Sequence, residues 1–198
     1  MLRITGGDFR GRRVQAPKTR HTRPTAEKVR QALFNVLEHM AVLSGARVAD
    51  LFAGSGALGI EALSRGAHHV TFVESHGKTA GLIRSNLKTL EVDGSRWRVE
   101  TQAVEGWLRN LAADSPVEVI LADPPYADDL ATITLAALAR SAGVPEGAIV
   151  VMECARRNPP ALPENLELIQ SKSYGDTDIY FCRKRISDAI TGPGDGEQ

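Results

Sequence analysis

The chain has 198 residues, 42% of them hydrophobic, and its 24 basic and 24 acidic side chains give a net charge of zero. This length suits one domain with a short appendage. The composition argues against a membrane protein, because no apolar run approaches the roughly 20 residues that a spanning helix needs, and we expect no secretion signal, because no apolar stretch follows the charged first residues.

The charges are unevenly distributed along the chain. Residues 1–30 hold nine basic and two acidic side chains, a net charge of +7, and the rest of the chain carries −7. Because Lys and Arg release counterions from a nucleic-acid backbone, we interpret this segment as a phosphate-binding arm, with a solvated tail as the alternative. Interleaved glycines favour a short hairpin with Ile4 and Val14 on its strands. The arginines of this hairpin are Arg10, Arg12 and Arg13.

A helix is expected to begin near Thr25, because Pro24 ends what precedes it and Thr25 can cap the free backbone N–H groups. Apolar residues then recur at helical spacing as far as Met40. Beyond Gly45 the sequence alternates between strand and helix patterns. The expected strands cover residues 47–52, 69–74, 96–101, 117–122 and 148–153, and the expected helices cover residues 57–65, 78–90, 104–111 and 130–142.

After residue 153 the alternation stops. Residues 166–173 and 177–184 form two extended runs joined by Tyr174-Gly-Asp176, which indicates a hairpin. Successive strand–helix units predict an α/β fold with a doubly wound, mostly parallel sheet, because parallel strands need crossovers. The hairpin would add an antiparallel element at one edge of this sheet.

Cys154 and Cys182 lie in or beside separate apolar segments with strand patterns. This setting favours reduced core thiols over a disulfide or a metal site, and it indicates a cytoplasmic protein. His68 and His69 have no partners at ligand spacing, so we expect no metal ligands.

A glycine-rich loop follows the first strand of the predicted sheet and opens a helix, which is where doubly wound sheets bind ligands. Gly54 and Gly56 let the backbone turn tightly and approach a ligand closely. The pattern Gly54-x-Gly56-x-x-Gly59 also matches a dinucleotide fingerprint, with Glu74 twenty residues after Gly54 as a ribose acceptor. The loop alone therefore leaves NAD and S-adenosylmethionine open.

Asp50 favours S-adenosylmethionine. A dinucleotide would place a pyrophosphate near the end of this strand, where an acid is unfavourable, whereas S-adenosylmethionine has no phosphate and carries a sulfonium and an ammonium group. Glu74 would accept hydrogen bonds from the ribose hydroxyls, and the adenine would rest near Gln102 and Ala103. Ala53, within the loop, completes the expected cofactor-binding residues.

The sequence Asp123-Pro-Pro-Tyr126 follows the fourth strand. An exocyclic amine on a base is a poor nucleophile, because its lone pair is delocalised into the ring. Asp123 and the Pro124 carbonyl can accept its two N–H bonds, and successive prolines hold that carbonyl in place. Both acceptors would stabilise the positive charge that develops on the nitrogen, and Tyr126 can stack on a base that has left its helix.

Two motifs and several shorter segments carry a family resemblance. Asp50 to Glu61 resembles motif I of class I methyltransferases, and Asp123 to Tyr126 resembles motif IV of amino-methyltransferases that act on nucleic acids. The shorter segments are Arg3-Ile-Thr-Gly-Gly7, Arg10-Gly-Arg12, Arg23-Pro-Thr25, Arg30-Gln-Ala-Leu-Phe-Asn35 and Ser173-Tyr-Gly-Asp-Thr177. Over residues 1–185 the chain resembles the bacterial 16S ribosomal RNA guanine-N2 methyltransferase family (RsmD-like).

This resemblance implies a seven-stranded Rossmann-like fold, S-adenosylmethionine as methyl donor and one guanine of the small-subunit ribosomal RNA as substrate, free or in an assembly intermediate. The residues carried over by position are Gly54, Gly56 and Glu74 for the cofactor, Asp123 and Tyr126 for the guanine, and Arg10, Arg12, Arg23 and Thr25 for the RNA. Gln102 departs from the Asp or Asn that many methyltransferases have near the adenine.

We therefore expect a basic RNA-binding extension over residues 1–24, a methyltransferase domain over residues 25–185, and a disordered tail over residues 186–198. No feature of the sequence requires an oligomer, so we expect a monomer. A DNA adenine-N6 methyltransferase and a non-catalytic RNA-binding or ribosome assembly factor remain as alternatives. The short chain argues against the DNA enzyme, because it leaves no segment large enough to read a DNA sequence.

Overall fold

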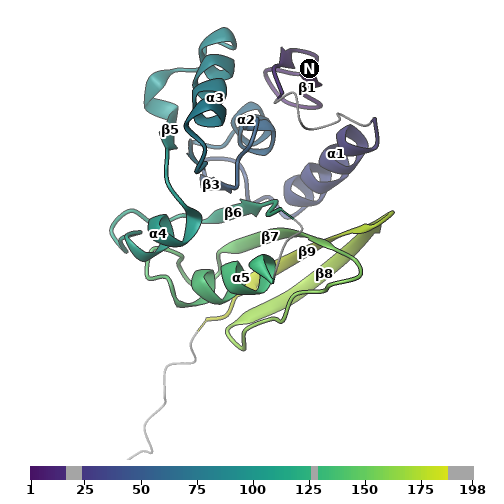
Figure 1. Ribbon diagram of the computed structural model, residues 1–198, viewed down its shortest axis with the longest axis vertical. Helices are drawn as coiled ribbons and strands as arrows, with labels where there is room; N and C mark the ends of the chain where they lie inside the picture. The colour runs from purple at the N-terminus through teal and green to yellow at the C-terminus, as the bar shows by residue number, and fades with distance from the viewer. Residues whose placement is uncertain (17–23, 126–128, 187–198) are drawn as a thin grey trace, which may run out of the picture.

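Figure 1 shows the computed structural model, which describes residues 1–16, 24–125 and 129–186, without the side chains of residues 24–26. Four sequence predictions fall outside the described part: the contacts of Arg23, the side chain of Thr25, Tyr126, and the tail beyond Ile186. No helix in the described ranges combines the length and the apolar character that crossing a membrane requires.

The described residues form a two-stranded sheet, a seven-stranded sheet and five α-helices. The strands are β1 (Leu2–Arg3), β2 (Arg13–Val14), β3 (Arg47–Leu51), β4 (His69–Val73), β5 (Trp97–Glu100), β6 (Val119–Ala122), β7 (Ile149–Ala155), β8 (Leu166–Tyr174) and β9 (Thr177–Lys184). The helices are α1 (Pro24–His39), α2 (Ala57–Ser64), α3 (Gly77–Thr89), α4 (Val104–Arg109) and α5 (Leu130–Arg140), and a short 3₁₀ helix (Gly94–Arg96) precedes β5.

The large sheet has the strand order β5-β4-β3-β6-β7-β9-β8. Strands β3 to β7 are parallel, and β9 pairs antiparallel with β7 and with the edge strand β8. The predicted doubly wound sheet with a C-terminal antiparallel hairpin is therefore confirmed. From β3 the chain continues to β4 on one side and later to β6 on the other, so the carboxyl ends of β3 and β6 flank a topological switch point.

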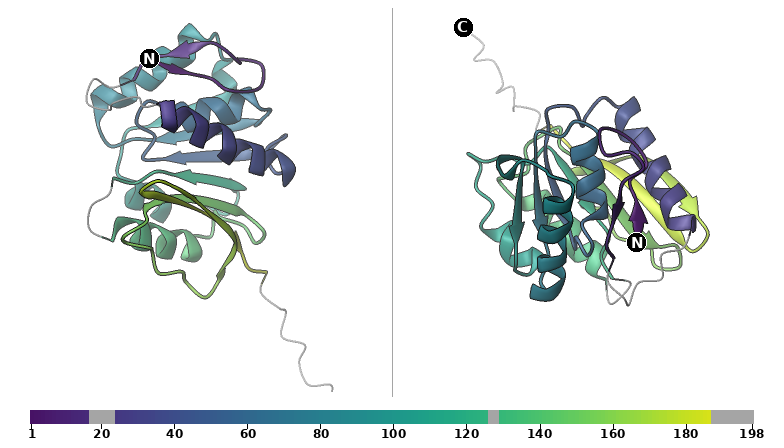
Figure 2. Two further views of the ribbon diagram at one scale, coloured as in Figure 1. Left: turned by 90° about the vertical axis from the view of Figure 1, so that its right-hand side faces the viewer. Right: turned by 90° about the horizontal axis from the view of Figure 1, so that it is seen from above.

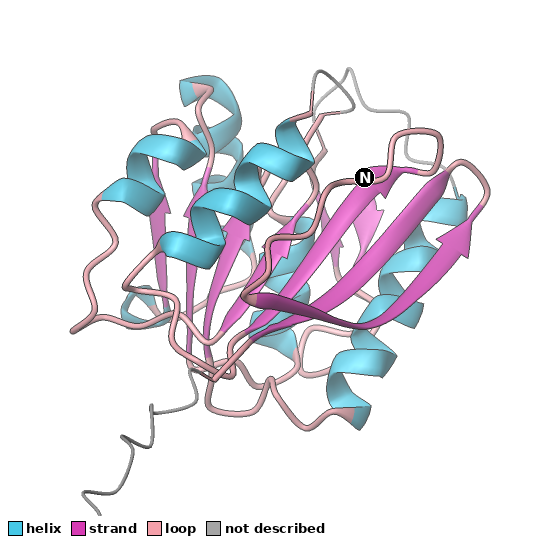
Figure 3. Ribbon diagram, turned by 90° about the horizontal axis from the view of Figure 1, so that it is seen from below, coloured by secondary structure: helices cyan, strands magenta, loops and turns pink. Residues whose placement is uncertain are grey.

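Helices cover both faces of this sheet (Figure 3). Apolar residues of α1, α2 and α3 pack on one face, and those of α4 and α5 pack on the other. The central strands β3 and β6 are buried almost throughout, as strands with both faces covered must be. The apolar stripe that predicted α1 supplies Leu33, Val36 and Leu37 to the first face.

The predicted N-terminal hairpin is also present, with Leu2 opposite Val14 and Arg3 opposite Arg13. It lies beside α1 and α2 (Figures 1 and 2), and its residues Ile4 and Val14 are buried in the first face of the core. Gly7 has a φ of 71°, and a Cβ there would lie 1.7 Å from the Ser64 carbonyl oxygen. The hairpin therefore packs against the end of α2 so closely that only glycine fits.

Candidate cofactor and substrate site

The glycine loop between β3 and α2 has a backbone shaped by left-handed residues. Phe52, Gly54 and Gly56 have φ values of 58°, 56° and 76°. Glycine adopts this conformation freely, but a bulky residue such as Phe52 does so at a cost of about 1–3 kcal/mol, and such strain concentrates at functional sites. Phe52 was not among the predicted site residues, because no sequence pattern predicts a positive φ at a phenylalanine in this position.

Gly59 sets the distance between α2 and the sheet. A Cβ on Gly59 would lie 2.3 Å from Phe72 Cε1 and 2.9 Å from Val70 Cγ1, both on β4. No larger side chain fits there without moving the helix. The third glycine of the pattern thus brings α2 and the loop that precedes it close to the carboxyl ends of the strands.

Asp50 joins the end of β3 to the first turn of α2. Its side chain is buried, and Oδ2 accepts a 2.8 Å hydrogen bond from the Gly59 backbone N–H. A carboxylate at the start of a helix satisfies a free N–H group and interacts favourably with the helix dipole. Asp50 therefore holds the glycine loop in shape, and direct contact between Asp50 and a cofactor stays a prediction.

Glu74, directly after β4, lies against the same loop. Its buried carboxylate accepts hydrogen bonds from the Gly54 N–H at 2.9 Å and from the His76 N–H at 2.8 Å. The Ala53 N–H donates to the carbonyl of Val73. A carboxylate offers about four acceptor positions, so Glu74 retains acceptor capacity for a ribose. The structure thus brings Ala53, Gly54 and Glu74 together.

The two residues expected near an adenine follow β5, the next strand of the sheet. Gln102 is half-buried and donates a 3.3 Å hydrogen bond from Nε2 to Glu100 Oε2. Ala103 is exposed and precedes the first residue of α4. Because β3, β4 and β5 are parallel neighbours, the loops that follow them all lie at the carboxyl ends of the strands, on the same side of the sheet's end.

These residues fit S-adenosylmethionine better than a dinucleotide. A pyrophosphate would need free N–H groups at the start of α2, but the Gly59 N–H donates to Asp50, which adds a negative charge there. The same carboxylate suits the cationic groups of S-adenosylmethionine, and Glu74 suits a ribose with either ligand.

Asp123 and Pro124 follow β6, whose last residue Ala122 lies opposite Leu51 of β3. Asp123 is half-buried, Pro124 is buried and Pro125 is exposed. The strand pairing therefore puts the predicted amine acceptors beside the glycine loop, as the sequence analysis expected.

A pocket of about 140 Å³ adjoins the two prolines. Its lining includes Pro124, Pro125, residues 129–132 at the start of α5, Glu153, Arg157 and Asn158. The pairing of Ala122 with Met152 puts Glu153 alongside Asp123. Glu153 and Arg157 were not predicted as site residues, although Glu153 is the last residue of the fifth expected strand and Arg157 follows it shortly afterwards.

The arginines of the hairpin have different surroundings. Arg12 donates hydrogen bonds to the carbonyls of Thr89 at 2.7 Å and Leu90 at 3.1 Å, at the end of α3. The side chains of Arg10 and Arg13 are exposed and make no hydrogen bond or ion pair with the residues that the structure describes. Arg12 thus anchors the hairpin, while Arg10 and Arg13 face solvent.

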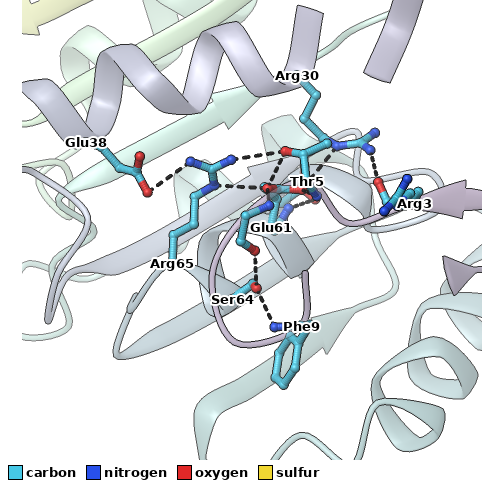
Figure 4. Close-up of polar contacts among 11 residues, drawn as sticks. Arg3, Thr5, Phe9, Arg30, Glu38, Glu61, Ser64 and Arg65 are labelled. Carbon is cyan, nitrogen blue, oxygen red and sulfur yellow. Dashed lines mark hydrogen bonds and ion pairs between the residues drawn. The ribbon is translucent and has the colours of Figure 1, made fainter. Parts of the chain in front are cut away.

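Figure 4 shows a buried acid, Glu61 of α2, at the centre of the contacts that hold the hairpin. Glu61 is fully buried, and its carboxylate accepts hydrogen bonds from the Thr5 N–H at 2.9 Å, the Thr5 hydroxyl at 2.6 Å and the Gly6 N–H at 2.8 Å. It also pairs with Arg65 at 2.9 Å and with Arg30 at 3.4 Å. Arg30 belongs to the basic segment over residues 1–30, but its guanidinium is buried and paired with Glu61, so its charge is not available to a phosphate.

Known proteins are similar to this chain over most of its length. The family model described as "Conserved hypothetical protein 95" matches residues 2–183. "Ribosomal RNA small subunit methyltransferase D" of Haemophilus influenzae is 33% identical over 174 residues, which cover 88% of this chain and 89% of that protein.

Solved structures share the fold. A putative methyltransferase from Escherichia coli, yhhF, has a TM-score of 0.82 and 30% identity, and the match covers 93% of this chain and 98% of that one. A putative methyltransferase complexed with SAH has a TM-score of 0.61 at 14% identity, covering 80% of this chain and 49% of that one, which shows similarity of fold alone.

Proposed function

Since the chain belongs to the family described as conserved hypothetical protein 95 and is similar over most of its length to a ribosomal RNA small subunit methyltransferase D, we propose that it methylates the exocyclic N2 amine of a guanine in 16S ribosomal RNA, with S-adenosylmethionine as methyl donor. The acceptor is free RNA or a small-subunit assembly intermediate in the cytoplasm.

The observation that carries this proposal is the position of two motifs, which follow the carboxyl ends of two neighbouring strands in the middle of the sheet. The glycine loop follows β3, and Asp123-Pro124 follows β6, with Leu51 opposite Ala122 in the pair. Ligands of doubly wound sheets bind outside the carboxyl ends of the strands at such a switch point. A cofactor-binding loop and a pair of amine acceptors therefore face one crevice.

The cofactor half of the site rests on two carboxylates. Glu74 lies against the Gly54 N–H and can accept from ribose hydroxyls, and Asp50 makes the start of α2 negative. S-adenosylmethionine, when bound, supplies an activated methyl group. The chain's own residues hold the loop, present acceptors and exclude a pyrophosphate.

The substrate half of the site rests on Asp123 and the Pro124 carbonyl. Each accepts one N–H of the amine, which orients the nitrogen lone pair and stabilises the positive charge that develops during transfer. Tyr126 stacks on the base. A guanine must leave its helix or lie in a single-stranded region to reach these groups.

The proposed RNA binding rests on the exposed arginines of the hairpin. Arg10 and Arg13 lie on the surface of an element that Glu61 and Arg12 fix rigidly to the domain. Exposed guanidinium groups on a rigid support are suited to phosphate contacts.

The test compares labelled-methyl transfer to three acceptors: deproteinised 16S ribosomal RNA, partly assembled small-subunit particles and duplex DNA. We expect transfer to one or both RNA substrates, and nuclease digestion followed by mass spectrometry should identify N2-methylguanine as the product. The Asp123→Ala variant serves as the matched inactive control.

Other outcomes would assign a different function. Transfer to DNA adenine alone would overturn the proposal in favour of a DNA methyltransferase. If calorimetry detects no binding of S-adenosylmethionine or S-adenosylhomocysteine, a non-catalytic RNA-binding factor is the better description.

A further inference from the structure

The carboxyl end of β7 carries an acid beside the predicted amine acceptors. β7 is the parallel neighbour of β6, and Ala122 lies opposite Met152 in that pair. The next residue along β6 is Asp123 and the next along β7 is Glu153, and both are half-buried. Because neighbouring strands lie about 4.8 Å apart, a single base can reach the side chains that follow both strands.

The pocket beside the two prolines contains a hydrogen-bond acceptor and a cationic donor. Glu153, Arg157 and Pro124 all line it, and its volume is about 140 Å³. A cavity of about 150 Å³ holds a benzene molecule, so this pocket has room for a planar aromatic ring. An ionised carboxylate only accepts hydrogen bonds and a guanidinium only donates them. The two side chains therefore distinguish ligands by the pattern of donors and acceptors at the ring edge.

The exocyclic amines of the bases differ in the ring nitrogen that lies beside them on the Watson–Crick edge. Beside the N2 amine of guanine is N1–H, a donor, and O6, an acceptor, comes next along the edge. Beside the N6 amine of adenine and the N4 amine of cytosine is a ring nitrogen with a lone pair, an acceptor. Enzymes that act on an extruded base read it by hydrogen bonds to this edge.

An acid next to the amine acceptors consequently favours one base. Asp123 and the Pro124 carbonyl suit the amine of guanine, adenine or cytosine equally well. Glu153 meets a donor only when the amine is that of guanine, and with the other two bases its carboxylate would face a lone pair. A site built to accept a substrate N–H rejects analogues that lack it, because its polar groups are then left unpaired.

We propose that Glu153 and Arg157 select guanine, with Glu153 accepting the N1–H of the base and Arg157 donating to its O6. The inference rests on the proposed function and names the residues that choose the base for that reaction. A carboxylate offers about four acceptor positions, so contacts of Glu153 within the protein leave room for a base N–H. Arg157 is exposed at the pocket, where its guanidinium can reach an incoming base.

The test replaces a single guanine, the one at which mass spectrometry locates the methyl group, with 2,6-diaminopurine in otherwise unchanged 16S ribosomal RNA. This base keeps the N2 amine that accepts the methyl group. It has a lone pair at N1 in place of the N–H and an amine in place of O6. The ratio of kcat/KM for the two RNAs measures the preference, and we expect the wild type to prefer guanine at least about tenfold.

Two variants remove the proposed contacts one at a time. In E153Q the amide can donate to the N1 lone pair of 2,6-diaminopurine, and in R157Q the cationic donor opposite position 6 is gone. Each variant should lower the preference for guanine at least about fivefold, the low end of the range for a specific contact to a base edge. Arg157 is exposed, so R157Q supplies the test even if E153Q does not fold.

Arg156 and Glu167 provide matched controls. Both are exposed, and neither lines the pocket. R156Q removes the same positive charge as R157Q from the adjacent position, and E167Q removes the same negative charge as E153Q from the edge strand β8. We expect both control variants to keep the wild-type preference for guanine, and an equal fall in R156Q and R157Q would overturn the inference.

The results separate this inference from the proposed function. Equal kcat/KM for the two RNAs in the wild type, or the wild-type preference in either E153Q or R157Q, overturns the inference alone, because N2-methylguanine is still the product. If the wild type makes no N2-methylguanine in either RNA or in assembled particles, the proposed function is overturned and the inference with it.

Discussion

The Asp50 carboxylate accepts a 2.8 Å hydrogen bond from the Gly59 N–H inside the protein, so that a residue near the end of β3 also holds the first turn of α2. This contact has two separable parts, a hydrogen-bond acceptor and a negative charge. Asp50→Asn keeps an acceptor of the same shape and removes the charge, whereas Asp50→Ala removes both.

We expect Asp50→Asn to weaken S-adenosylhomocysteine binding by about tenfold, the ratio that corresponds to 1.4 kcal/mol, with a small change in stability. Asp50→Ala should in addition lower the free energy of unfolding by about 1–3 kcal/mol, because it leaves the Gly59 N–H unsatisfied. Calorimetric titration and urea unfolding measure the two effects. Equal loss of stability in both variants would show that the charge itself supports the fold.

Asp123→Ala should lower methyl transfer by at least about a hundredfold, the scale of removing one preorganised charge-stabilising group. Binding of S-adenosylhomocysteine should stay near the wild-type value, since the cofactor residues follow other strands. Asp123→Asn, which keeps an acceptor, should retain more activity than the alanine variant. Single-turnover assays measure the rate of methyl transfer. A wild-type rate in Asp123→Ala would show that Asp123 does not take part in the transfer.

Replacing Arg10 and Arg13 together with alanine should weaken RNA binding and reduce the salt dependence of the affinity by about one unit of log–log slope for each lost phosphate contact. Arg12→Ala is the matched comparison, because its guanidinium contacts the carbonyls of Thr89 and Leu90. It should lower the melting temperature, with a smaller effect on the slope. RNA titrations at several salt concentrations measure the slopes. If Arg12→Ala reduces the salt dependence of RNA affinity and the double variant does not, the assignment of phosphate contacts to Arg10 and Arg13 is wrong.

Glu61→Ala should lower the free energy of unfolding by about 3–5 kcal/mol, because removing one member of a buried ion pair leaves buried charge uncompensated. Arg30 would lose its acid, and Arg65 would keep only its ion pair with the half-exposed Glu38. The exposed Glu105, paired with Arg109 at 3.1 Å, offers the same substitution as a control that should cost about 0.5 kcal/mol or less. Urea unfolding of both variants measures the difference, and similar losses would rule out the anchoring role of Glu61.

Burial raises the pKa of both thiols, Cys154 and Cys182, from 9.0 to about 11. The folded protein therefore favours the protonated thiols. Their contribution to stability is fully present below pH 9 and is lost as the pH rises from about 9 to about 11. We expect alkylation by iodoacetamide at pH 8 to be slow in the native protein and fast in urea. Rapid native alkylation of both residues would contradict this burial.

The arrangement of the sheet followed from the sequence because its signals are local and repeated. Alternating strand and helix patterns predicted the five parallel strands of the large sheet, and two extended runs joined by a turn predicted its antiparallel hairpin. The motifs at Gly54 and Asp123 predicted which loops meet. The twenty-residue spacing predicted Glu74 as a ribose acceptor of the same site, and the structure places its carboxylate against the Gly54 N–H, while the ribose contact stays a prediction. Such features depend on residue order and on rules for connecting parallel strands.

The interior polar contacts had no comparable signal. Glu61 ends a recognisable motif, but nothing in its neighbourhood in the sequence indicates that it meets Thr5 and Gly6, more than fifty positions earlier. Arg12 and Arg30 counted as free positive charge, whereas packing turns them toward a helix end and a buried acid. Asn86 sits in an ordinary helix pattern, and only the fold shows that its buried amide contacts the backbone of Gln15 and Ser55.

The docking of the hairpin also imposes an order on folding. Thr5 is 56 positions from Glu61, and Arg12 is 78 positions from Leu90, so the hairpin cannot reach its partners until the ribosome has synthesised most of α2 and α3. Contacts of such long sequence separation close large loops and form late. Arg12, near the start of this sequence, therefore has to wait for the whole of α3 before its guanidinium can reach the carbonyls that hold it in the folded protein.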